Sequence, residues 1–430
     1  MKKYYNLGKK SLFHLNRSIT GKGLLDTLKI IKKEFPRLKI NKVKSGTKVF
    51  DWIIPDEWNV NEAYIIDKNG KKIIDFKKNN LHLVGYSRSI NKKLKKKELL
   101  KNFFYLINQP NAIPYVTSYY KKIWGFCVSY NQYQNIKKNY SKNDMFKVII
   151  KSNFKKNGNL HFGELVLRGK TKQEILISTY VCHPSMANNE LSGTIVSMAL
   201  IDYFKKYKKL DKTLRFIFIP ETIGSITFLS KNYKNLRENV IGGYNLTCIG
   251  DNKNHSCMLS KYKNSPSDNA LIEAYKKLKI KNYKIYSFLE RGSDERQYNS
   301  PGIDLPISSI FRTRYGKYPE YHTSLDNFNL VTLKGVTGGF LVAKEAIENI
   351  LKSIYPKYKY LCEPQMKKRN MYPNLSGKKK IPGLIQNYMD FLQYSDGKTS
   401  LKKISSFIGL NIKSTKKIYF TLLKKKLIKY

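Results

Sequence analysis

The stretch between residues 174 and 204 constrains the fold more than any other part of the sequence. Residues 174–180 form an apolar run typical of a buried strand, and residues 194–204 have the pattern of a helix. The loop between them, 181–193, carries His183 together with two amides and a carboxylate. Because α/β proteins place their ligands at the carboxyl ends of strands, we expect an α/β fold with a functional site beside His183.

The same alternation of strand-like and helix-like runs continues over residues 145–355. This pattern predicts a layered sheet with helices on both faces, and we assign residues 1–45 and 141–375 to this α/β/α domain. The expected strands are 146–150, 163–167, 175–180, 214–219, 243–249 and 305–310, and the expected helices are 21–32, 192–207, 267–278 and 331–354.

Residues 46–140 have a different pattern, which predicts a small inserted β-rich domain. Several short strand-like runs follow one another here, and residues 68–70 have the composition of a hairpin turn. The expected strands are 48–54, 63–67, 72–76 and 81–86. The region ends in an aromatic tract, 115–127, which we expect to line the cleft of the larger domain.

The C-terminal region follows a lysine-rich linker that contains Pro364, Pro373 and Gly377. Residues 381–430 predict three short helices and a glycine turn, which is typical of a winged-helix or helix-turn-helix module. The expected helices are 384–392, 400–408 and 414–427, and the turn is 409–411.

Taken alone, the formal net charge of +50 favours binding to nucleic acid or to an anionic surface. The lysines are scattered along the whole chain and far outnumber the arginines, so we attribute the charge to a compositional bias of the source genome. The five cysteines form no CxxC pair, no apolar run follows Lys2 and Lys3, and no run is long enough to span a membrane. We therefore expect a cytoplasmic protein with reduced thiols.

Polar side chains also follow other expected strands. Glu221 comes directly after an apolar run, Asp251 follows the next strand, and His322 lies in a polar segment near the end of the domain. Loops at one edge of a sheet converge, so two histidines and several carboxylates are expected to meet, as in zinc sites. Each residue also has a plainer interpretation, because single histidines are often structural and Glu221 could instead cap a helix.

The order of these motifs resembles a known group. The chain is similar to a bacterial aminopeptidase-like family of uncharacterised function, which is related to the co-catalytic zinc aminopeptidases and to glutaminyl cyclases. The resemblance implies a three-layer α/β/α domain of the zinc-aminopeptidase type, an inserted β-rich domain and a C-terminal winged helix. The segments that carry it are 17–21, 45–52, 183–193, 220–225, 318–324 and 381–430.

The resemblance also implies roles for individual residues. It makes His183, Asp251 and His322 metal ligands and Glu221 the general base. Asn189 stands where the family's dinuclear relatives have a bridging aspartate, and Glu190 is a substitute for it if the loop shifts by one residue. Thr222 stands at a second ligand position. Three alternatives therefore stay open. The site binds two zinc ions, or it binds one ion, held by His183 or by Asp251 and His322, or it binds no zinc.

Three functions follow from the sequence. The first is a zinc-dependent aminopeptidase-like hydrolase of a small peptide or amide substrate, whose pocket is shaped by Asp294, Glu295, Arg296 and Tyr321. The second is a metal-poor protein of the same fold that acts in binding or assembly. The third is a nucleic-acid-binding regulator; the last helix lacks the Arg, Asn and Gln that read bases, so we favour docking or homo-oligomerisation through the winged helix.

Overall fold

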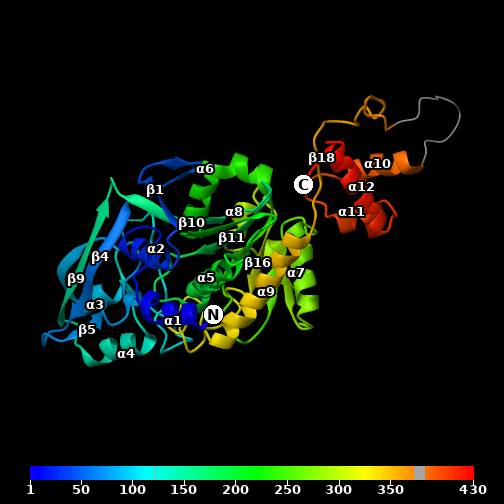
Figure 1. Ribbon diagram of the computed structural model, residues 1–430. Coiled ribbons are helices and arrows are strands. Elements are labelled where there is room, and N and C mark those ends of the chain that lie inside the picture. The colour runs from blue at the N-terminus through cyan, green and yellow to red at the C-terminus, as the bar shows by residue number, and fades with distance from the viewer. Residues whose placement is uncertain (122, 372–382) are drawn as a thin grey trace.

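The computed structural model describes residues 1–121, 123–371 and 383–430. Figure 1 shows a central α/β body, a lobe with a second sheet at one side and a helical C-terminal unit at the other. The hydrophobic core of the body is continuous with the core of the lobe, whereas the C-terminal unit has a core of its own.

The body is built on an eight-stranded mixed sheet with the order β1-β10-β12-β11-β13-β16-β14-β15. Its four central strands pair in parallel, and every residue in them is buried, which explains their continuous apolar runs. The strands are β1 (Lys39–Lys44), β10 (Asn159–Leu167), β11 (Glu174–Tyr180), β12 (Thr213–Ile219), β13 (Val240–Leu246), β14 (Ser256–Met258), β15 (Lys284–Tyr286) and β16 (Ile307–Phe311).

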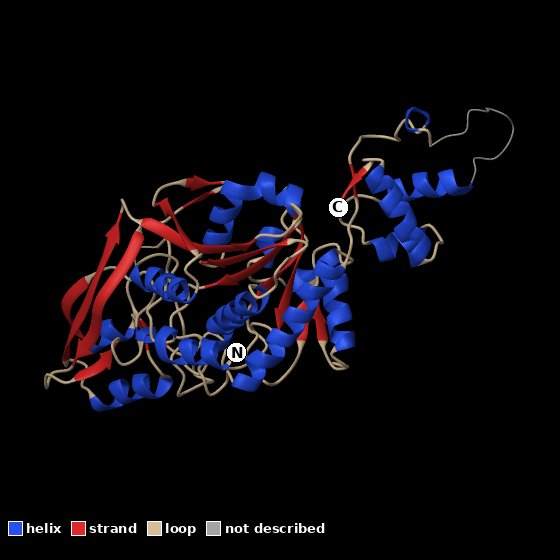
Figure 2. Cartoon of the chain, in the orientation of Figure 1, coloured by secondary structure: helices blue, strands red, loops and turns tan. Residues whose placement is uncertain are grey.

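Helices cover both faces of this sheet (Figure 2). One face packs against α1 (Lys2–Leu7), α2 (Lys22–Glu34), α5 (Ser192–Phe204), α7 (Pro266–Lys277) and α9 (Leu333–Lys352). The other face packs against α6 (Ile223–Asn239), and the short α8 (Glu295–Tyr298) contacts α6 and β16. The three-layer α/β/α architecture is thereby confirmed.

The lobe contains a four-stranded antiparallel sheet with the order β5-β4-β9-β6. Its elements are β4 (Glu57–Ile66), β5 (Lys72–Asp75), β6 (Ile90–Lys95) and β9 (Met145–Lys155), flanked by α3 (Lys96–Leu100) and α4 (Tyr130–Asn139). The strand predicted at 146–150 was assigned to the wrong sheet: it is part of β9, which pairs along its length with β4 and then leads into β10. The predicted turn at 68–70 does join β4 to β5.

Other predicted strands of the lobe are shorter than expected. Residues 48–54 form the small hairpin of β2 (Lys48–Val49) and β3 (Trp52–Ile53). The strand predicted at 81–86 is absent: a 3₁₀ turn, η2 (Asn80–His82), opens the segment, and isolated bridges follow it. Leu81, Leu83 and Val84 are nevertheless buried, so the apolar run reflects burial and not a strand. Two further short strands, β7 (Phe103–Phe104) and β8 (Phe126–Cys127), pair beside them.

The C-terminal unit has the predicted three helices, α10 (Gly383–Gln393), α11 (Leu401–Phe407) and α12 (Ile412–Lys424). A terminal strand, β18 (Ile428–Lys429), pairs antiparallel with β17 (Lys357–Tyr358). Gly409 has a φ of +65° in the predicted turn. Two of the linker residues, Pro373 and Gly377, lie outside the described residues. Within the described ranges, no helix is both long and apolar enough to cross a bilayer.

The parallel strands place the candidate residues at one edge of the large sheet. β11, β12 and β13 run in the same direction, so the loops that follow them emerge at the same edge. The first of these loops contains a π-helical turn, η3 (Ala187–Leu191), which leads directly into α5. The aromatic tract of the lobe reaches this edge, because Pro114 bridges to Thr323 and the Tyr115 amide donates to the carbonyl of His322.

Candidate functional site

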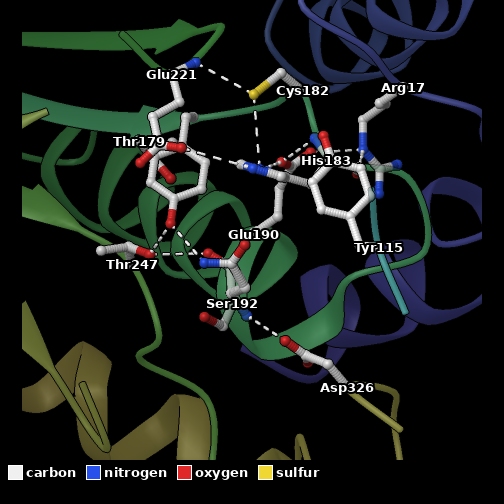
Figure 3. A network of polar contacts seen from close by, with 12 residues as sticks. Arg17, Tyr115, Thr179, Cys182, His183, Glu190, Ser192, Glu221, Thr247 and Asp326 are labelled. Atoms are coloured by element: carbon white, nitrogen blue, oxygen red, sulfur yellow. Dashed lines mark hydrogen bonds and ion pairs between the residues drawn. The ribbon is translucent and has the colours of Figure 1, made fainter. Parts of the chain in front are cut away.

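His183 lies at the centre of the site, in the loop after β11 (Figure 3). Its Nδ1 is 2.8 Å from Glu190 Oε2, and its backbone N–H donates to the same oxygen. The other oxygen of Glu190 accepts a 2.7 Å hydrogen bond from Nε of Arg17, and both side chains of this ion pair are fully buried. The second ring nitrogen of His183, Nε2, therefore faces the open part of the site.

Glu221 lies on that open side of His183. Its Oε2 is 3.6 Å from His183 Nε2, and its side chain is 21% exposed. The loop is tightly folded, because the Glu221 amide donates to Sγ of Cys182 and Thr222 has a φ of +64° just before α6. Burial raises the pKa of Glu221 above its ordinary value. A partly exposed carboxylate with a raised pKa is suited to general-base chemistry.

His322 completes a cluster of rings with His183. The two ring centroids are 5.4 Å apart, and the Tyr115 ring meets both imidazoles edge-on at 5.2 Å. The Tyr321 ring stacks on His322 at 3.9 Å. Burial, and then the neighbouring His183, lower the pKa of His322 to about 3, so its ring is neutral. Its Nε2 is buried and has no hydrogen-bond partner among the described residues.

Asn189 is held from two sides in the turn η3. Its Nδ2 donates to the Tyr180 hydroxyl at 2.8 Å, and its backbone N–H donates to Asp326 at 2.9 Å. The hydroxyl of Thr247 also donates to the Asn189 carbonyl at 2.8 Å. The side-chain oxygen, Oδ1, is buried and makes no hydrogen bond within the described part of the chain. Asn189 thus has a free oxygen where the resemblance implied a bridging carboxylate.

Asp251 has contacts of a different kind. Its carboxylate accepts hydrogen bonds from the amide and hydroxyl of Thr313 at 2.9 and 2.8 Å, from Lys253 N at 2.9 Å and from Asn188 Nδ2 at 3.1 Å. Strand β13 ends at Leu246, so four further residues separate Asp251 from the strand end. The structure therefore gives Asp251 a set of protein partners of its own, and its role as a metal ligand stays a prediction.

The residues expected to shape the pocket surround the Glu221 loop. Asp294 Oδ1 accepts from Thr222 N and from Ser225 Oγ, both at 2.8 Å, and Arg296 donates to the Thr222 hydroxyl at 2.6 Å. Burial, and then the charge of Glu221, raise the pKa of Asp294 to about 7. Glu295 points elsewhere: its Oε1 accepts from the amides of Gly292 and Ser293 and from Tyr315, which makes it a clamp for its own loop.

The donor atoms decide how a zinc ion would fit. Among the described residues, one group of three has ligand atoms within 4.8 Å of one another: Cys182, His183 and Glu190. Both Glu190 oxygens are already used, and burial raises the pKa of the Cys182 thiol to about 11, so this group offers few free lone pairs.

Three further donor atoms belong to this site. His322 Nε2 and Asn189 Oδ1 are buried and unpartnered in the described structure, and His183 Nε2 faces the same side as Glu221. Two imidazoles that share a tetrahedral zinc at about 2.0–2.1 Å place their ring centroids roughly 5 Å apart. The observed centroid separation is 5.4 Å. The set is neutral, so an ion held there would bind with an affinity lowered by the missing carboxylate.

Sequence reasoning missed several residues that build the site. Arg17 was noticed only as part of a motif, and its contact with Glu190 spans 173 positions. Asp326 accepts from the amides of Asn188 and Asn189, and Tyr180 packs its ring 5.3 Å from that of His183. Asp326 lies in the same polar segment as His322, which was the available signal; nothing in the sequence marked Tyr180, the last residue of an apolar strand.

Comparisons with known proteins agree with this architecture. A family model described as a domain of unknown function (DUF4910) matches residues 5–353, and a winged helix-turn-helix model matches residues 353–430. A Clostridium acetobutylicum protein, provisionally named a polysaccharide biosynthesis protein with an aminopeptidase-like domain, is 39% identical over 418 residues, which make up 96% of this chain and 92% of that protein.

Solved structures extend the likeness. A crystal structure of a provisionally assigned peptidase from Clostridium acetobutylicum has a TM-score of 0.79 and 36% identity, and the match covers 100% of this chain and 96% of that one. A zinc aminopeptidase from Bacillus subtilis has a TM-score of 0.60 over 81% of this chain and 94% of its own; at 12% identity this likeness concerns the fold alone. The chain therefore belongs to the DUF4910 family and combines an aminopeptidase-like fold with a C-terminal winged helix.

Proposed function

We propose that the protein hydrolyses a peptide or amide bond at the cluster of His183, His322 and Glu221, with the help of a single zinc ion. The observation that carries this proposal is a pair of imidazole rings whose centroids are 5.4 Å apart. His322 Nε2 is buried without a partner among the described residues, and Glu221 Oε2 lies 3.6 Å from His183 Nε2. A buried nitrogen without a partner is costly, so His322 Nε2 calls for a bound partner, and an ion there supports the proposal.

His183 Nε2, His322 Nε2 and Asn189 Oδ1 would hold the ion. When bound, zinc would act as a Lewis acid on the scissile carbonyl and on a bound water. The surrounding rings keep the two imidazoles in place before any ion binds, because Tyr115 contacts both edge-on and Tyr321 stacks on His322. This preorganisation lowers the entropy cost of forming the site.

Glu221 would act as the general base. Its carboxylate accepts the proton of the attacking water and then delivers it to the leaving nitrogen. The hydrogen bonds of the Glu221 amide to Cys182 and of Arg296 and Asp294 to Thr222 hold its loop against the site. Thr222, in place of a second carboxylate, leaves Glu221 as the acid-base group of that loop.

The test uses the full-length chain, a panel of peptides and amides with free and blocked N-termini, and zinc measured by elemental analysis. We expect Glu221→Gln to lower kcat/KM by about 10²- to 10⁴-fold while zinc content stays the same. Glu320→Gln is the matched control, because Glu320 is a carboxylate of the same region that pairs with Lys253. Activity that survives Glu221→Gln would contradict the proposal.

A second candidate is a metal-free protein of this fold that binds a ligand without hydrolysing it. The neutral Asn189, at the place of a bridging carboxylate, favours this alternative, since zinc then lacks a negatively charged ligand. It predicts no zinc retained after dialysis and no turnover of any substrate in the panel. One equivalent of zinc together with turnover would exclude it.

A further inference from the structure

The buried ion pair of Arg17 and Glu190 has no part in the chemistry described above. Both side chains have 0% exposure, and neither residue offers an open face to a substrate. Burying two charges costs several kcal/mol per ion unless their contacts are well formed, so a fully buried pair beside a site calls for a specific role. Its contacts show what that role is.

Glu190 binds His183 twice. The carboxylate accepts from Nδ1 of the ring at 2.8 Å and from the backbone N–H of the same residue. An ionised carboxylate can only accept hydrogen bonds, so the nitrogen that faces it must carry a proton. The proton on Nδ1 leaves the lone pair of the neutral ring on Nε2, which is the nitrogen that faces Glu221.

Arg17 anchors the carboxylate of Glu190. Its Nε donates to Glu190 at 2.7 Å and to the carbonyl of His183 at 3.0 Å, and its Nη1 donates to the carbonyl of Leu12. The guanidinium is therefore tied to the N-terminal segment, to the backbone of His183 and to Glu190 at once.

In the π-helical turn η3, the side chains of the neighbours Asn189 and Glu190 point in different directions. Asn189 directs its amide to Tyr180, whereas Glu190 directs its carboxylate to His183 and Arg17. Glu190 thus does not replace a bridging metal ligand, since both of its oxygens already have protein partners.

We infer that Glu190 is a positioning residue that fixes the Nδ1–H tautomer of His183, and that Arg17 anchors the Glu190 carboxylate against that ring. The inference deepens the proposed function, on which its catalytic meaning rests, because the tautomer presents the Nε2 lone pair to the zinc position. Carboxylate partners of this kind typically change metal affinity or activity by about 10- to 100-fold when they are removed.

The test is nitrogen NMR of full-length chain labelled at its six histidines, stripped of metal and held at a pH where the ring of His183 is neutral. The signal is assigned by its loss in His183→Asn. We expect a protonated Nδ1 and an unprotonated Nε2. In Glu190→Gln, a single carbonyl oxygen must serve Arg17 and His183 together, so the population moves toward Nε2–H. Arg17→Met combined with Glu190→Met removes both charges and is expected to show the same change.

Glu174→Gln is the matched control, since Glu174 of β11 forms a comparable buried pair with Arg215 of β12, with contacts of 2.7 and 2.8 Å. It is expected to lower stability without changing the tautomer of His183. An Nε2–H tautomer in the unmodified protein, or a tautomer unchanged in both Glu190 variants, would overturn the inference. The readout needs no turnover, so a failed proposed function would show in Glu221→Gln and leave this result intact.

Discussion

Asn189→Asp is the most informative single substitution in this protein. The side-chain oxygen of Asn189 is buried without a partner in the described structure, next to a hydrogen bond from its Nδ2 to Tyr180. The substitution keeps the size of the side chain and adds one negative charge. Tyr180 can then donate to the carboxylate in place of accepting from the amide, at the expense of its 2.5 Å hydrogen bond with Thr247.

Two electrostatic effects of opposite sign set the magnitude. A unit charge about 4 Å from a divalent ion gains roughly 8 kcal/mol at an effective dielectric constant of about 20. Burying the carboxylate costs several kcal/mol. The balance leaves about 3 kcal/mol in favour of zinc binding, which corresponds to roughly 100-fold tighter binding. Without zinc the same carboxylate has no cation beside it, so the metal-free variant is expected to be less stable than the parent by about 2 kcal/mol.

Zinc affinity is measured by competition with a chromophoric chelator, and stability by thermal unfolding with zinc and with a chelator. Asn188→Asp is the matched control, because Asn188 adjoins Asn189 but donates to Asp251 at 3.1 Å and accepts from the amides of Gly250 and Asp251. It is expected to lower stability without raising zinc affinity. Equal zinc affinity in Asn189→Asp and the parent would refute the assignment of Oδ1 as a ligand.

Two further predictions concern the framework of the molecule. Asp326→Asn weakens the hydrogen bonds from the amides of Asn188 and Asn189, at 2.5 and 2.9 Å. It is expected to lower the free energy of unfolding, measured in urea, by about 2–3 kcal/mol. A decrease under ~0.5 kcal/mol would contradict the role of Asp326 in holding this turn. Glu348 accepts from Tyr203, Tyr207 and Lys352, and the pKa of its carboxyl is lowered from 4.5 to about 2 by these contacts, against the effect of burial. The contribution of Glu348 to stability is thus complete above about pH 4.5 and is lost as the pH falls toward about 2. Glu348→Gln should therefore reduce the loss of unfolding free energy between pH 7 and pH 3 by about 1–2 kcal/mol. The same loss in the variant and the parent would contradict this role of Glu348.

The central strands of the large sheet could be predicted because they are buried on both faces. β11, β12, β13 and β16 are rich in apolar residues, and helices follow them along the chain. The same signal led to a wrong sheet assignment for β9, which also carries an apolar run. β9 pairs in the small sheet and β10, the next strand along the chain, pairs in the large one. The choice of partner strand is a tertiary property that no local pattern contains.

The site was predictable in part for a related reason. His183 and Glu221 follow soon after the ends of β11 and β12, and the rule that strand ends converge explains why their side chains lie close together. Asp251 follows the end of β13 by several residues, and its partners, such as Thr313, come from another part of the chain. Arg17 reaches the site through a contact that spans 173 positions, so its pairing with Glu190 could not be derived from spacing.

The X-ray absorption spectrum of the zinc-loaded protein tests the central claim most directly. Zinc–sulfur distances of about 2.3 Å are readily distinguished from zinc–nitrogen and zinc–oxygen distances of about 2.0–2.1 Å. We expect one zinc per chain with two imidazole ligands, light-atom scatterers at the remaining positions and no sulfur, as required by His183, His322 and Asn189. A sulfur ligand would instead assign the ion to Cys182, and the loss of zinc on dialysis would contradict a resident metal at this site.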